Sequence, residues 1–257
     1  MLWGAKQHGT VMDIQAVILV CLAFAAGGIV KGATGAGAPL FAVPLMAMQR
    51  DIKFAVAVLV LTNIVPNLWQ FWQYRRAMTP ARFGVLFAVA GGIGAGLGTV
   101  ALAGWKPDLL VLIVGGVLAL YIAFRLLNPR WRLSMAAGWR LVVPAGIVAG
   151  ALQGATGLSA PVSITFLNAL KLERETFIAT ISLFFVMLGV IQLPAQFALG
   201  ITTPHLVLLS ALALIPLMLA MPVGAWLGRR LPQVVFERLI LVILAVLAVR
   251  LLWSGLM

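Results

Sequence analysis

Charged residues are scarce in this chain of 257 residues. They make up 9% of it, whereas a typical water-soluble domain is about a quarter charged. Hydrophobic residues make up 63%, and apolar stretches of about 20 residues, the length that crosses a bilayer's hydrocarbon core, recur along the whole chain. The sequence therefore predicts an all-α integral membrane protein that crosses the membrane several times.

Carboxylates and histidines are rarer still, and all of them fall at or near the ends of predicted spans: Asp13, Asp51, Asp108, Glu173, Glu175, Glu237, His8 and His205. Cation transporters and proton relays keep such groups inside the membrane, and a metal site needs a cluster of ligands. The sequence also lacks a paired acid and base for hydrolysis and a phosphate-binding loop for ATP. We therefore expect no enzyme activity, no metal and no other cofactor.

Basic residues, by contrast, are in excess, with 18 Lys and Arg against 6 acidic residues and a net charge of +12. They sit in short clusters between apolar spans, which is typical of loops retained beside anionic lipid on the cytoplasmic side. We therefore expect the bilayer, and not nucleic acid, as the partner of these charges. Cys21 is the one cysteine in the sequence, so an intrachain disulfide is excluded.

Eight apolar segments follow one another along the chain: 13–48, 54–74, 82–103, 107–127, 138–170, 175–198, 205–228 and 232–254. The first and fifth are too long for one ordinary crossing, and each has a glycine-rich break near its middle. Each of these two predicts two shorter helices joined by non-helical backbone. The whole chain then contains about ten helical pieces.

The two long segments also reveal a duplication. Gly28–Pro39 aligns with Gly150–Pro161 at an offset of 122 residues, and both contain Gly-Ala-Thr-Gly and Ala-Pro. Pro107 aligns with Pro232 at an offset of 125. We therefore predict a first transmembrane repeat at 1–127, an interfacial linker at 128–140 and a second repeat at 141–257. Each repeat would be a broken helical hairpin followed by three transmembrane helices.

Loop charges indicate how the repeats are oriented. In the first half the basic loop follows the second apolar segment and contains Arg75, Arg76 and Arg82. In the second half the basic loop follows the third apolar segment and contains Arg229 and Arg230. Because positive loops stay inside, the two repeats should be inverted, with both termini outside and the linker inside. The slightly positive loop at 50–53 is the exception to this arrangement.

The two Gly-Ala-Thr-Gly segments are the strongest candidates for a binding site. Glycine tolerates unwound backbone, and the prolines beyond suit the first turn of a new helix, whose free N–H groups and dipole favour an anion. The predicted substrate-binding residues are Lys31, Gly32, Thr34, Gly35, Gly37, Gln153, Gly154, Thr156, Gly157 and Ser159. The alternative is that the glycines only allow close helix packing. Lys31 could neutralise the anion or extend to the interface.

Side-chain amides form a second, weaker set of candidates for lining a translocation path: Asn63, Asn67, Gln70, Gln192 and Gln196. The first three are spaced at i, i+4 and i+7, so they share one helix face. Amides in membrane helices can line a path or simply tie helices together.

At these residues the chain resembles the sulfite exporter TauE/SafE family, also called the toluenesulfonate uptake permeases. The resemblance covers essentially the whole chain and rests on the length, the duplication and the glycine-rich motifs Gly28–Pro44 and Gly146–Pro161. It implies movement of sulfite, thiosulfate, sulfonates or other small organic anions across the bacterial inner membrane, without a bound cofactor.

The leading hypothesis is a secondary transporter that moves a small anion by alternating access, with its site at the interface of the two repeats. An anion channel and a non-transporting membrane subunit of a partner enzyme are the alternatives. Expected partners are the anionic substrate and the bilayer, and a homodimer is left open.

Overall fold

The structure is a computed structural model that describes residues 14–34, 38–48, 51–128, 131–230 and 233–256. These residues form ten α-helices and one short 3₁₀-helix, which confirms the all-α prediction and the number of helical pieces. The elements are α1 (Ile14–Thr34), α2 (Ala38–Ala47), α3 (Ile52–Tyr74), η1 (Arg75–Ala77), α4 (Ala81–Gly104), α5 (Pro107–Leu127), α6 (Met135–Thr156), α7 (Ala160–Ala169), α8 (Arg174–Ala198), α9 (Pro204–Arg230) and α10 (Gln233–Leu256).

Six of the described helices are long and apolar enough to cross a bilayer: α3, α4, α5, α6, α8 and α9. Shorter apolar stretches lie in α1, α2, α7 and α10. Large apolar side chains point outward along the bundle, among them Leu22, Leu97 and Leu120, which are 63–72% exposed. Such a surface is unfavourable in water and is expected against lipid. The protein is therefore a multi-pass membrane protein.

Both long apolar segments divide where the sequence predicts. In the first, α1 ends at Thr34 and α2 begins at Ala38; in the second, α6 ends at Thr156 and α7 begins at Ala160. The second residue of each short helix is a proline, which suits a first helical turn because its missing N–H would be unpaired there anyway. The helix α6 starts at Met135, so it takes in the last six residues of the predicted linker.

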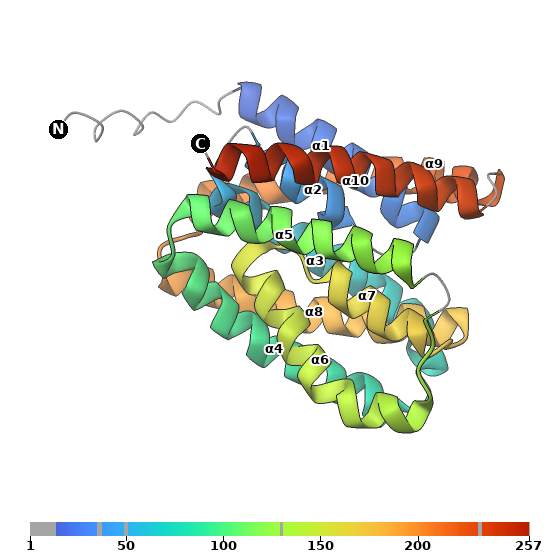
Figure 1. Cartoon of the computed structure of the whole chain (residues 1–257). Helices are drawn as coiled ribbons and strands as arrows, with labels where there is room; N and C mark the ends of the chain where they lie inside the picture. The colour runs from blue at the N-terminus through green and yellow to red at the C-terminus, as the bar shows by residue number, and fades with distance from the viewer. Residues whose placement is uncertain (1–13, 35–37, 49–50, 129–130, 231–232, 257) are drawn as a thin grey trace.

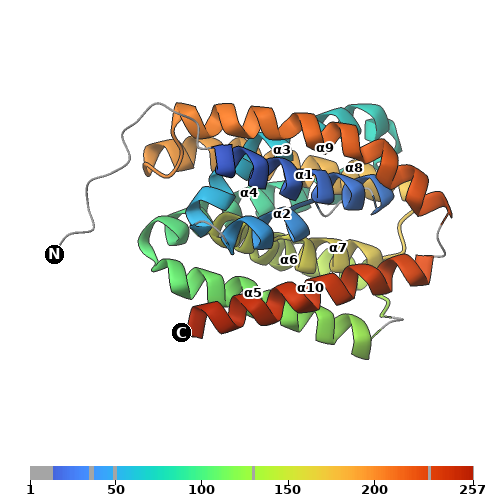
Figure 2. The same ribbon diagram turned by 90° about the horizontal axis from the view of Figure 1, so that it is seen from above.

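The short helices α2 and α7 lie in the middle of the bundle (Figures 1 and 2). The helices α3 and α8 pack against each other at the centre, α1 packs on α9, and α4 packs on α6. On one side of the bundle α5 and α10 lie next to each other in both views and run in opposite directions. Figure 1 also shows that α1 and α6 run in opposite directions along the bundle.

Glycine allows the closest contact of α1 with α9. A Cβ added at Gly28 would lie 2.4 Å from the carbonyl oxygen of Leu217, and one at Gly32 would lie 2.0 Å from that of Met221. From the other side, a Cβ at Gly224 would lie 1.9 Å from the oxygen of Ile29. No side chain fits at such distances, so the two backbones touch directly, as in small-residue packing of membrane helices.

The contact of α4 with α6 is built in the same way. A Cβ at Gly150 would lie 2.0 Å from the oxygen of Gly91, and one at Gly154 would lie 2.2 Å from that of Ala95. A Cβ at Gly98 would in turn lie 2.1 Å from the oxygen of Ala151. The glycines at the C-terminal part of α6 therefore hold this helix firmly on α4 and fix where its end can lie.

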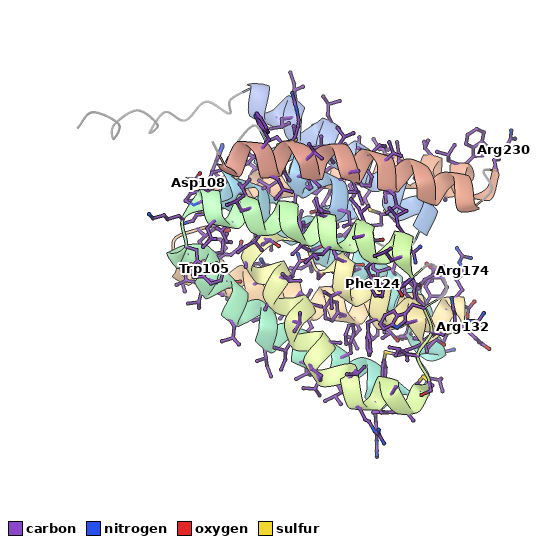
Figure 3. The ribbon with its side chains drawn as sticks, in the orientation of Figure 1. Trp105, Asp108, Phe124, Arg132, Arg174 and Arg230 are labelled. Atoms are coloured by element: carbon purple, nitrogen blue, oxygen red, sulfur yellow. The ribbon has the colours of Figure 1, made fainter. Side chains whose placement is uncertain are left out.

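Charges separate to the two ends of the bundle. In Figure 3 Arg132, Arg174 and Arg230 lie at one end, and Trp105 and Asp108 lie at the other. The described charges at the first end, where α3, α5, α7 and α9 finish, are mostly basic: Arg75, Arg76, Arg82, Arg125, Arg132, Arg140, Lys171, Arg174 and Arg230, against Glu173 and Glu175. This end is the one that the positive-inside rule places in the cytoplasm.

The charge of the loop at 50–53 does not fit this rule; Arg50 lies outside the described residues, and the contacts of Asp51 and Lys53 are local. The side chain of Asp51 caps α3 by accepting a 3.1 Å hydrogen bond from the backbone N–H of Lys53. The Nζ of Lys53 donates a 3.0 Å hydrogen bond to the carbonyl oxygen of Ala103, in the last turn of α4. Its positive charge therefore lies at the negative end of the α4 helix dipole, and it does not indicate on which side of the membrane this loop lies.

Candidate functional site

The second break, between α6 and α7, is organised around Gln153. Its side chain is completely buried, and its Oε1 accepts a 3.1 Å hydrogen bond from the backbone N–H of Ser159. Its carbonyl oxygen accepts a 2.7 Å hydrogen bond from Gly157, which has φ = +75° and ends α6 in the left-handed conformation that glycine adopts most easily. One glutamine thus fixes the geometry of the whole turn.

Two donor groups at this turn have no hydrogen-bond partner among the described residues. They are Nε2 of Gln153 and Oγ of Ser159, and both side chains are fully buried. Because Oε1 of Gln153 faces the Ser159 N–H, its amide nitrogen must face the other way. A buried donor without an acceptor costs about 1–3 kcal/mol. The turn is therefore suited to a ligand that brings acceptor atoms.

The hydroxyl of Thr156, also predicted to bind substrate, is engaged within its own chain segment. Its Oγ1 donates a 2.7 Å hydrogen bond to the carbonyl oxygen of Leu152 and accepts a 3.3 Å one from the N–H of Leu158. Its proton is therefore in use. Thr156 shapes the turn and leaves Ser159 and Gln153 as the unpaired donors.

On the first half, Lys31 is turned into the protein. It is 3% exposed, and its Nζ donates a 2.9 Å hydrogen bond to Oδ1 of Asn67 on α3. The Nδ2 of Asn67 donates in turn to the carbonyl oxygen of Asn63, at 2.6 Å. Of the two alternatives for Lys31, the structure shows the buried one, and the side chain does not extend to the membrane–water interface. A protonated lysine has three donor hydrogens, and the hydrogen bond to the neutral amide of Asn67 uses one of them.

The predicted glycines divide into two kinds. Gly32 and Gly154 lie inside helices, where they allow the close packing of α1 on α9 and of α4 on α6. Gly157 is at the break itself, and a Cβ there would lie 2.8 Å from Cγ2 of Val43 on α2. Gly35 and Gly37, like the side chain of Thr34, lie outside the described residues.

The predicted amides also divide. The Nε2 of Gln192, on α8, is 3.5 Å from the carbonyl oxygen of Gln153, which places this side chain at the second break. The Oε1 of Gln196 accepts a 2.6 Å hydrogen bond from Thr202, in the connection to α9, so it ties that connection to α8. Gln70 is partly buried, and its Oε1 has no partner among the described residues.

The two polar clusters, Lys31 with Asn67 and Gln153 with Gln192, lie on either side of the crossing of α3 and α8. At this crossing a Cβ on Gly189 would lie 2.3 Å from Cγ1 of Ile64. Asn67 and Gln192 each follow the crossing by three residues on their own helix, which is about 4.5 Å along the axis. Because α3 and α8 run in opposite directions (Figure 1), the two clusters lie on opposite sides of it.

The hydroxyl of Ser182 was not identified from the sequence. Ser182 on α8 is fully buried, and its Oγ has no partner among the described residues. It is fourteen residues before Gln196, or nearly four helical turns, so it returns to the same face of α8 as Gln196. That periodicity is the signal that would have added Ser182 to the polar face of α8.

The helical bundle and its lipid-suited surface define the class of the protein as a polytopic membrane protein. A profile of the family Sulfite exporter TauE/SafE matches residues 19–251, which is most of the chain. The chain therefore belongs to the TauE/SafE family of membrane transporters, and it is not an enzyme. Comparison with curated proteins and with solved structures found no match.

Proposed function

We propose that the protein is a secondary transporter that carries a small sulfur-containing oxyanion across the bacterial inner membrane by alternating access. The observation that carries the proposal is the pair of unpartnered, fully buried donors at the second break, Nε2 of Gln153 and Oγ of Ser159. A sulfur oxyanion presents several acceptor oxygens around one centre and can accept from both donors at once. A cation would need acceptors here instead, and the Nε2 of Gln153 can only donate.

Lys31 supplies the positive charge on the other side of the α3–α8 crossing. In the lipid-shielded interior, an ammonium that hydrogen bonds to a neutral amide keeps its attraction for a negative solute. An anion at the first cluster would replace or share the Asn67 contact. The first cluster would then bind the anion mainly through charge and the second through directed hydrogen bonds.

Packing supports the inverted duplication on which alternating access would depend. Gly28 and Gly150 correspond at an offset of 122 residues, and they pack against Leu217 and Gly91, which are offset by 126. Gly32 and Gly154 correspond at the same offset of 122, and their partners Met221 and Ala95 are also offset by 126. The helices that correspond, such as α1 and α6, point in opposite directions in Figure 1. Transporters with inverted repeats place their sites between the repeats, near the midplane.

The test exchanges one amide for a carboxylate at two positions. Gln153→Glu keeps an acceptor for the Ser159 N–H but loses the donor and adds a negative charge, so we expect flux of sulfite and thiosulfate into proteoliposomes to fall to background. Gln73→Glu makes the same exchange at an exposed glutamine of α3 and is the matched control, expected to transport within about threefold of wild type. Equal flux in both variants would contradict the site.

A counterflow assay separates a carrier from a channel. Proteoliposomes preloaded with unlabelled anion should accumulate labelled anion transiently, because a carrier exchanges its substrate across the membrane in single-molecule steps. A channel would dissipate the gradient without this accumulation and would pass large unitary currents. The carrier proposal requires counterflow in wild type and its loss in Gln153→Glu.

A further inference from the structure

A groove of about 510 Å³ opens on the side of the bundle between α5, α6 and α7. Its walls are almost entirely apolar and include the outward-facing side chains of Leu120, which is 72% exposed, and Val148, which is 51% exposed. Thr165 contributes the one buried hydroxyl in the described lining that has no hydrogen-bond partner. A concave apolar surface that faces the membrane is a place where a lipid chain can be held.

The groove covers the depth of one leaflet. On α6 its lining runs from Leu141 to Leu152, eleven residues apart, or about 16 Å of helix. The hydrocarbon core of a bilayer is about 30 Å thick, so this length is about half of it. This length matches one acyl chain, which spans one leaflet.

The groove ends at the basic side of the bundle. Trp131 lines the groove at this end and packs edge to face on Phe124, with ring centroids 5.1 Å apart. The backbone N–H of Leu133 donates a 2.8 Å hydrogen bond to the carbonyl oxygen of Ala169, which holds the linker against the end of α7. Arg132, which is exposed, therefore lies beside the mouth of the groove, at the same end as Phe124 in Figure 3.

We propose that this groove binds an anionic phospholipid of the arginine-bearing leaflet, with one acyl chain between α5 and α6 and the headgroup at Arg132. The length of the groove matches one leaflet, and the basic mouth matches a negative headgroup. The lipid would pack against Pro161 and Leu152, which lie on the two helices that flank the second break. The bound lipid therefore holds the α6–α7 hairpin against α5 from the membrane side.

The experiment titrates the purified full-length protein in mixed micelles with phosphatidylglycerol or phosphatidylethanolamine and follows its apparent Tm. A ligand that binds only the folded state raises Tm, so phosphatidylglycerol should raise it and phosphatidylethanolamine should raise it much less. Val148→Trp fills the groove and should abolish the difference. Arg132→Gln should move the midpoint to about fivefold higher lipid, the loss expected for one surface arginine.

Two matched variants control for position. Val223→Trp adds the same bulk to an outward-facing site on α9, and Arg230→Gln removes an exposed arginine from the same end of the bundle. Both should respond to phosphatidylglycerol as wild type does. Leu120→Trp fills the groove from its other wall and replaces Val148→Trp if that variant does not fold.

Three results would overturn the proposal. The first is a Tm response to phosphatidylglycerol in both groove-filling variants equal to that of wild type. The second is an equal response of wild type to the zwitterionic lipid. The third is efficient disulfide cross-linking of Val148→Cys between two chains in native membranes, in a Cys21→Ser background, which would show that a second copy covers the groove. None of these readouts depends on transport.

Discussion

The Nζ of Lys31 donates a 2.9 Å hydrogen bond to Oδ1 of Asn67, and the amide of Asn67 is in turn bonded to the backbone of Asn63. This contact joins α1, which precedes the first break, to α3 at the centre of the bundle. It places an amine in the interior, at 3% exposure. An ionisable group buried in a membrane protein is costly to keep, and we propose that Lys31 is kept for binding the anion.

Lys31→Met is expected to lower anion flux at subsaturating substrate by roughly tenfold or more, because a hydrogen bond to a charged group contributes about 1.5–3 kcal/mol. The apparent Tm should stay unchanged or rise, because the variant removes a buried charge whose partner is neutral. Lys106→Met, at an exposed lysine, is the control. A fall in Tm together with normal flux per folded protein would make Lys31 a structural residue.

Gly32→Ala is expected to destabilise the protein, because the new methyl group would lie 2.0 Å from the backbone oxygen of Met221. Overpacking of this kind costs about 1–3 kcal/mol. Gly116→Ala, in the interior of α5, meets no atom within 4 Å and should stabilise the helix by about 0.5–1 kcal/mol. Scanning fluorimetry in detergent measures both shifts. Equal Tm values for the two variants would contradict the packing role of Gly32.

Gly157→Ala is expected to impair transport. Gly157 has φ = +75°, and a Cβ there would lie 2.8 Å from Val43 on α2. Gly200→Ala is the matched control, since Gly200 has φ = +68° but nothing within 4 Å. Both variants carry a backbone cost of about 1–2 kcal/mol, so a larger loss of flux and Tm in Gly157→Ala isolates the contact with α2. Adding Val43→Ala should restore part of that difference.

Cysteine labelling tests the topology. In a Cys21→Ser background, Arg132→Cys and Asp108→Cys report on the two ends of the bundle that Figure 3 separates. In whole cells a membrane-impermeant maleimide should label Asp108→Cys directly and Arg132→Cys only after permeabilisation. The reverse pattern would turn the protein over in the membrane. Labelling of both positions in intact cells would contradict the assignment of α5 as a complete crossing.

The two glycine-rich motifs were predictable from the sequence in part. The sequence predicted a glycine-rich break near the middle of both long segments, and α1 and α6 do end within these stretches, at Thr34 and Thr156. It could not separate the glycines that unwind from the glycines that pack. Gly154 and Gly157 belong to the same motif, yet one lies against Ala95 of α4 and the other takes a positive φ beside Val43. That difference depends on which helix lies opposite each residue.

The sequence by itself determined the membrane class, the ten helices and the places where two of them break. These are local properties, because in lipid each helix must satisfy its own backbone hydrogen bonds, and only Gly and Pro interrupt them readily. The tertiary structure alone decided that Lys31 turns inward to Asn67 and that the amide of Gln153 accepts from Ser159 while its nitrogen is left unpaired. Side-chain partners come from backbone that packing brings together, 36 residues away in the case of Asn67, and no local pattern encodes that approach.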